Sequence, residues 1–115
     1  MSSRFNPAPL LEEYGDASLV RELAQLFIDS VSSQMEAVTE AAARGDAVGV
    51  KAAAHRLRGA LATFGAVSAT QLAQTLELMG ESGNLEGAPA LANELAVEVR
   101  DLCTGAAAWL SEHAA

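Results

Sequence analysis

Apolar residues recur at three- and four-residue spacing along most of the chain, and glycines interrupt the pattern at intervals. This spacing predicts α-helices, because residues three and four apart share one face of a helix. Half of the 115 residues are hydrophobic, mostly the strong helix formers Ala and Leu, whereas aromatic residues make up 4%. The chain is therefore predicted to be all-α. Its length suits a single domain over residues 1–115.

Four amphipathic helices follow from the pattern, each bounded by residues that cap, start or stop a helix. Residues 1–9 are expected to form an irregular lead-in and residues 10–14 a short helical turn. Short connections favour an antiparallel up-down four-helix bundle. In chain order the helix boundaries are Asp16 or Ser18 to Gly45, Asp46 to Gly65, a capping-box pattern over 68–71 to Gly80, and Pro89 onward.

The overall charge restricts the class of partner. The formal net charge is −8, from 15 acidic residues against seven Lys and Arg. Nucleic acids and anionic membranes call for basic surfaces, so neither is expected as a partner. No uncharged apolar run approaches the ~20 residues of a membrane span, and the first residues lack the apolar stretch of a secretory signal. A single cysteine, Cys103, indicates a reducing cytoplasm, and the start at Met1 favours a free-standing protein.

One basic cluster stands out against this acidic background. Three of the seven Lys and Arg residues, Lys51, Arg56 and Arg58, fall within residues 51–58 together with His55. On a helix, Lys51, His55, Arg58 and Gly59 share one face. The apolar stripe of the same helix is offset from them. His55 is therefore expected to face solvent.

This arrangement suits phosphoryl chemistry. A neutral imidazole is nucleophilic near pH 7, and Lys51 and Arg58 would stabilise the negative charge brought beside the ring. Gly59 leaves room for a phosphoryl group and an approaching partner, which offers a reason for a glycine inside a helix. A solvated surface histidine is the plainer interpretation. The residues alone leave both open.

A resemblance to a known family bears on this choice. Residues 54–59 read Ala-His-Arg-Leu-Arg-Gly and residues 64–66 read Phe-Gly-Ala. This resembles the signature of histidine-containing phosphotransfer (HPt) domains, His-x-Leu-Lys/Arg-Gly followed by a Gly-Ala pair that closes the helix. Leu72, Leu76, Glu77 and Gly80 resemble the next helix of the family at matching spacing. The resemblance extends from about residue 10 to residue 112.

The resemblance implies roles for individual residues. His55 would be the phosphorylation site, through its outward Nε2 atom. Arg58 takes the place of the usual lysine, and its different geometry would change the transfer rate. Glu77 falls where the family has Gln or Glu to hydrogen-bond the inner ring nitrogen. Glu81 departs from the pattern, because a basic residue is common there.

The implied function is a phosphorelay step in a two-component system. His55 would accept a phosphoryl group from a receiver-domain aspartate and donate it to another, in exchange with a histidine kinase or hybrid kinase. The chain would be a transfer intermediate rather than an enzyme, without a cofactor, and any Mg²⁺ would belong to the receiver. We expect a cytoplasmic monomer. Leu10, Leu11 and Tyr14 are candidates for partner docking.

Two alternatives remain open. In a non-catalytic helical adaptor, the 51–58 cluster would be only a charged docking surface. In a metal- or haem-binding bundle, His55 would be a ligand. No metal site is predicted, since the two histidines and the single cysteine are far apart and lack ligand spacing.

The remaining polar and aromatic residues receive structural interpretations. His113 is expected to lie at a solvated end and Cys103 to act as a small buried hydrophobe. Trp109 is expected to cap one end of the core. Phe64 should pack beneath the helix of His55, and Glu98 belongs to the acidic residues assigned to solvated helix faces.

Overall fold

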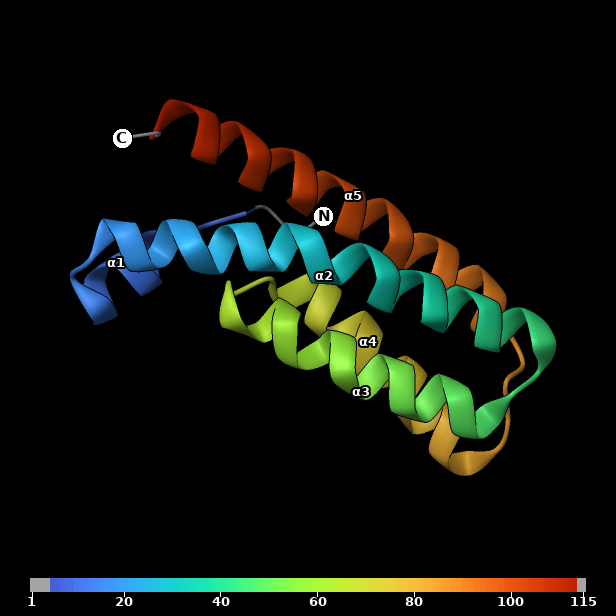
Figure 1. Cartoon of the computed structure of the whole chain (residues 1–115). Helices are drawn as coiled ribbons and strands as arrows, with labels where there is room; N and C mark the ends of the chain where they lie inside the picture. Colours follow the sequence, from blue (N-terminus) through green and yellow to red (C-terminus); the bar gives the residue numbers. More distant parts are fainter. Residues whose placement is uncertain (1–4, 114–115) are drawn as a thin grey trace.

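Five helices make up most of residues 5–113, the part of the chain that the computed structural model describes (Figure 1). No strand occurs in that part, so the all-α prediction is confirmed. None of its helices is both long and apolar enough to cross a membrane. The helices are α1 (Ala8–Tyr14), α2 (Ala17–Arg44), α3 (Ala47–Thr63), α4 (Val67–Ser82) and α5 (Ala88–Glu112).

The four long helices form the predicted antiparallel up-down bundle. Helix α2 packs against α3 and α5, α3 packs against α4, and α4 packs against α5. Figure 1 shows the α2–α5 pair along one side of the elongated molecule and the shorter α3–α4 pair along the other. The short helix α1 lies against α2. Within residues 5–113, no further helix covers the side of α3 and α4 that faces away from α2 and α5.

The core consists of aliphatic side chains with an aromatic group at one end. Among the largest fully buried side chains are Leu57, Leu61, Leu76, Leu95 and Leu102. Burying a leucine contributes about 1.5–3 kcal/mol.

The aromatic group lies where α3 ends. Phe64 is buried there and its ring centroid lies 5.1 Å from that of Phe27 and 5.1 Å from that of Phe5. Trp109 is half-buried, with its ring centroid 6.0 Å from that of Phe5. Phe64 and Trp109 thus take the positions predicted for them.

Two aspartates begin the helices that they were expected to cap. The carboxylate of Asp16 accepts hydrogen bonds from the backbone N–H groups of Ser18 and Leu19. The carboxylate of Asp46 accepts one from Gly49 at 2.9 Å. Each cap satisfies donors that the first helical turn leaves free.

The N-terminal boundary differs from the expected one. Helix α1 begins at Ala8, with Pro9 in its first turn, so the irregular lead-in ends at Pro7 rather than at residue 9. The fixed φ of proline and its missing N–H are both compatible with a first helical turn. Residues 1–4 lie outside the described part of the chain.

The capping box predicted over 68–71 is wrong. Helix α4 begins at Val67, and Ala66, the residue before it, supplies no side-chain cap. The Ser68 hydroxyl instead donates a hydrogen bond to Glu98 on α5 at 3.1 Å. Glu98 is 6% exposed, which also overturns its assignment to a solvated face. Its carboxylate lies at the first turn of α4, where the helix dipole favours negative charge.

The predicted break at Gly80 is wrong as well. Helix α4 continues through Gly80 to Ser82 and ends at Gly83, whose φ of 81° is the left-handed conformation typical of a helix C-terminus. Gly80 is buried inside the helix. Packing, rather than the end of a helix, therefore accounts for the glycine at position 80.

Candidate functional site

His55 projects from the outer face of α3. Its neighbours Ala54 and Leu57 are fully buried, whereas the His55 side chain is 65% exposed. Since buried and exposed positions alternate with the helical period, the imidazole is held by a rigid element but remains accessible to a partner. This is the orientation that the spacing predicts.

Glu77 on α4 fixes the orientation of the imidazole. Its Oε2 atom lies 2.9 Å from His55 Nδ1, and its own side chain is only 16% exposed. A carboxylate can only accept a hydrogen bond, so Nδ1 carries the proton in this contact. In a neutral ring the other nitrogen, Nε2, then keeps its lone pair. The contact thus directs the nucleophilic nitrogen away from Glu77.

Arg58 lies beside both members of this pair. Its Nε atom is 3.2 Å from Glu77 Oε1, which is buried and accepts no aligned hydrogen bond within residues 5–113. The guanidinium therefore balances that oxygen as an ion pair. Arg58 Nη2 is 3.4 Å from His55 Nδ1. It cannot donate to a nitrogen that already carries a proton, so this approach places charge near the ring without a bond.

Lys51 lies on the His55 face, but its ammonium group is engaged elsewhere. Lys51 Nζ is 3.9 Å from Glu81 Oε1, and both side chains are about half exposed. An exposed pair of this kind contributes little stability. The pairing with Glu81 does offset part of the positive charge at this end of the site.

Arg56 is exposed and forms no ion pair within the described residues.

Gly59 opens the other side of the imidazole. A Cβ atom added at Gly59 would meet nothing within 4 Å, so no packing inside the molecule requires a glycine there. Gly59, His55 and Arg58 line a hollow of about 340 Å³. A second hollow, of about 360 Å³, lies on the Lys51 and Glu77 side of His55.

Two residues that line the hollow beside His55 were not predicted from the sequence. Thr70 and Gln74 on α4 face the same hollow as His55 and Gly59. They precede Glu77 by seven and three residues, so they share its helix face. Extending that face back from Glu77 would have identified both.

The three docking candidates have different surroundings. Leu10 is 5% exposed, so it cannot contact a partner directly, and that part of the prediction is wrong. Leu11 is half-buried and Tyr14 is 50% exposed. The exposed Leu26 on α2 and the half-buried Ala60, which follows Gly59 on α3, line a further hollow.

Neither His113 nor Cys103 belongs to this site. The His113 ring stacks on Trp109 with centroids 4.9 Å apart, and its Nδ1 lies 2.9 Å from the Trp109 carbonyl. Burial raises the pKa of the half-buried Cys103 thiol, against the opposing effect of a hydrogen bond with Ser32. A raised pKa lowers the thiolate fraction, which fits a packing role rather than a reactive one.

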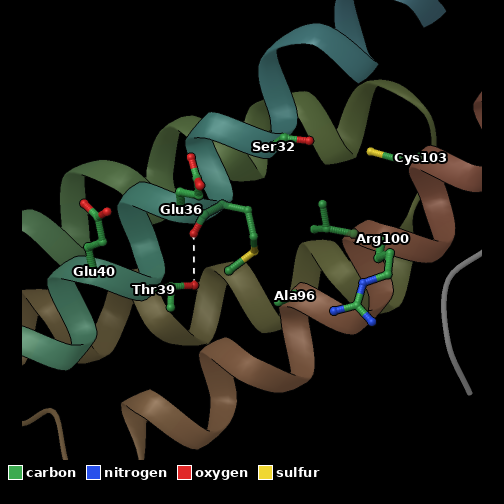
Figure 2. A pocket seen from close by; sticks show the side chains of 9 residues that line it. Ser32, Glu36, Thr39, Glu40, Ala96, Arg100 and Cys103 are labelled. Atoms are coloured by element: carbon green, nitrogen blue, oxygen red, sulfur yellow. Dashed lines mark hydrogen bonds between the residues drawn. The ribbon is translucent and has the colours of Figure 1, made fainter.

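Cys103 lines a separate hollow of about 480 Å³ between α2 and α5 (Figure 2). Met35, Ala96 and Val99 supply apolar lining, and charged or polar side chains surround them. Thr39 uses its hydroxyl to donate to the Met35 carbonyl at 3.1 Å, as the dashed line in Figure 2 marks. This hollow lies on the opposite side of the bundle from the α3–α4 face that carries His55.

Comparisons with known proteins agree with this geometry. The model of the Hpt domain family matches residues 22–109, a range that includes His55, Arg58, Gly59 and Glu77. The fold is similar to the crystal structure of histidine-containing phosphotransfer protein B (HptB) from Pseudomonas aeruginosa PAO1. The TM-score is 0.84 at 22% sequence identity, over 93% of this chain and 91% of that chain. No curated protein matches the sequence.

Proposed function

The chain belongs to the Hpt domain family, and from this premise we propose that His55 carries a phosphoryl group between the aspartates of receiver domains. Hpt domains are phosphotransfer intermediates of two-component systems that interact with histidine kinases and response regulators.

The contact between His55 Nδ1 and Glu77 Oε2, at 2.9 Å, is the observation that carries the proposal. The free Nε2 lone pair attacks the phosphorus of an aspartyl phosphate. An N–P bond forms, the P–O bond to the aspartate breaks, and its electron pair leaves with the aspartate carboxylate. The proton stays on Nδ1 and is donated in a hydrogen bond to the Glu77 carboxylate, whose negative charge stabilises the phosphorylated ring. The reverse reaction passes the group to the next receiver.

The surrounding residues support this reaction. Arg58 places a guanidinium beside the ring, where it offsets the charge of the incoming phosphoryl oxygens. Lys51 contributes a weaker charge because it is paired with Glu81. The open space at Gly59 admits the phosphoryl group and the receiver surface. Any Mg²⁺ belongs to the receiver's acidic pocket, which the basic residues around His55 complement.

The partner is a protein rather than nucleic acid or membrane, given the net charge of −8. Tyr14 and Leu11 stay candidates for docking, whereas the buried Leu10 acts only by supporting α1. In this proposal the phosphoryl group is supplied by other proteins, so the domain needs no cofactor of its own. We propose that it acts as a monomer in the cytoplasm.

A non-catalytic adaptor is the competing function. The basic residues around His55 would suit a charged docking surface equally well. The buried Glu77 favours the carrier, because a docking surface has no need of a carboxylate that selects one tautomer of the histidine.

Transfer of label from phosphorylated receiver domains separates the two functions. We expect the wild-type protein to take up the label, and His55→Ala to take up none. His113→Ala is the matched control, since His113 is exposed but stacks on Trp109 outside the site. It should label like the wild type.

An adaptor predicts a different pattern. His55→Ala would keep its binding to a receiver, and the wild type would remain unlabelled by every receiver that it binds. Equal labelling of wild type and His55→Ala would also contradict the proposal.

A further inference from the structure

Helix α4 packs closely against the backbone of α3 at Gly80. A Cβ atom added at Gly80 would lie 2.6 Å from the backbone nitrogen of Lys51, 2.9 Å from its Cα and 2.7 Å from the carbonyl oxygen of Ala47. Real Cβ atoms essentially never approach other atoms below 3.0 Å. These neighbours are backbone atoms of α3, so no rotation of a side chain can relieve the contact. A larger residue at position 80 must displace one helix from the other.

This contact lies one helical turn from the proposed site. Lys51 precedes His55 by four residues on α3, and Gly80 follows Glu77 by three residues on α4. The two helices are antiparallel, so the Gly80–Lys51 contact and the Glu77–His55 hydrogen bond occupy successive layers of the same seam. A displacement at the first layer is transmitted to the second, because helices behave as rigid elements over one turn.

Helix propensity does not explain the glycine. Inside a helix, glycine is less favourable than alanine, and α4 continues past position 80 to Ser82. Gly80 also has no positive φ that would require a glycine. Close approach of two backbones is the remaining local reason.

We propose that Gly80 is a positioning residue for the histidine site. By letting α4 approach α3 at Lys51, it brings Glu77 within hydrogen-bond distance of His55 Nδ1 and so keeps Nε2 unprotonated. Its effect on transfer rests on the proposed function. Its effect on the histidine tautomer does not, because the tautomer can be measured in the unphosphorylated protein.

The first experiment is a ¹H–¹⁵N NMR spectrum of the imidazole nitrogens in unphosphorylated wild type and Gly80→Ala, at a pH where the ring is neutral. We expect Nδ1–H to be the main form of His55 in the wild type. In Gly80→Ala the population of the Nε2–H form should rise and that of the Nδ1–H form should fall, because the contact between His55 and Glu77 is lengthened. Leu102→Ala is the control, because Leu102 is a fully buried residue of α5, away from this seam. It should lose stability and keep the wild-type tautomer.

The second experiment asks whether Gly80 acts through Glu77. Single and double variants are compared in the rate of phosphoryl uptake from a receiver. We expect Gly80→Ala and Glu77→Ala each to slow uptake by about tenfold, the lower end of the loss found when a group that orients a metal-bound histidine is removed. The double variant should be no slower than Glu77→Ala alone, because both changes remove the same contact.

Additive effects in the double variant would overturn the proposal, and so would an unchanged tautomer in Gly80→Ala. The wild-type spectrum is a test by itself, should Gly80→Ala fail to fold. A wild-type His55 that is mainly Nε2–H would contradict the positioning role. A wild type that takes up no phosphoryl group but keeps Nδ1–H would contradict the proposed function and leave the positioning of the ring supported.

Discussion

The two nitrogens of the His55 imidazole have different surroundings. Nδ1 faces the carboxylate of Glu77 at 2.9 Å, with the Arg58 guanidinium beside both groups, whereas the ring as a whole is exposed. Glu77 is largely buried, so its charge needs Arg58 as a partner. Arg58 pairs with Glu77, and under the proposed function it has a second task, presenting positive charge to a phosphoryl group.

Substitutions of Arg58 should distinguish these tasks. Arg58→Ala removes both, and we expect phosphoryl uptake to slow by about tenfold. Arg58→Lys keeps the charge but loses the planar guanidinium, which contacts Glu77 and approaches the His55 ring at the same time. Its rate of uptake should therefore lie between those of the wild type and Arg58→Ala. Single-turnover transfer from a receiver measures both rates. Arg21→Lys, on α2 away from the site, is the control and should leave the rate unchanged.

At the scale of helices, the sequence pattern predicted the elements better than their contacts. The helical period and the caps at Asp16 and Asp46 are local features, so they are visible in the sequence. The role of Gly80 was misread, because a glycine that ends a helix and one that packs closely look alike without a neighbouring backbone. Ser68 was assigned to a local cap, whereas its partner Glu98 lies 30 residues away.

The site shows the same division between local and distant features. His55, Arg58 and Gly59 share one helix face, which the spacing revealed. Their relation to Glu77 came only from the family resemblance, since no local rule joins residues of two helices. Thr70 and Gln74 were missed because their place in the site depends on how α4 packs against α3.

Glu98 provides a test of the contact between α4 and α5. Its buried carboxylate accepts a hydrogen bond from Ser68 at the first turn of α4. We expect Glu98→Ala to lower the free energy of unfolding by about 1–3 kcal/mol, the usual cost of leaving a buried polar group without its partner. Urea denaturation measures the change.

Glu94 offers a matched control one turn earlier on α5, where the side chain is exposed. Glu94→Ala should change stability by no more than about 0.5 kcal/mol. Equal losses in the two variants would show that the burial of Glu98 has no energetic consequence.

At the scale of the whole molecule, charge is distributed unevenly. The net charge is −8, yet His55 lies among Lys51, Arg56 and Arg58 on one side of the bundle. Electrostatic attraction between such a patch and an acidic pocket raises the association rate and falls with salt. Under the proposed function, we expect the acidic remainder of the surface to disfavour approach of a receiver in other orientations.

Arg56 tests this electrostatic contribution, because it is exposed and unpaired within the described residues. We expect Arg56→Ala to slow association with a receiver at low salt, and its rate to converge with the wild type as salt is raised. Stopped-flow binding over a salt series measures both. Arg100→Ala, on α5 at the hollow of Figure 2, should follow the wild type. A salt-independent rate, or an equal effect of Arg100→Ala, would contradict this account.

The position of the phosphoryl group on the ring tests the central claim most directly. The protein is labelled with ¹⁵N in its histidines, phosphorylated by a receiver domain and examined by ³¹P–¹⁵N correlation NMR. The Glu77 contact predicts a single N–P bond, at Nε2 of His55, with the proton retained on Nδ1. A phosphoryl group on Nδ1, on His113 or on no histidine at all would contradict the account.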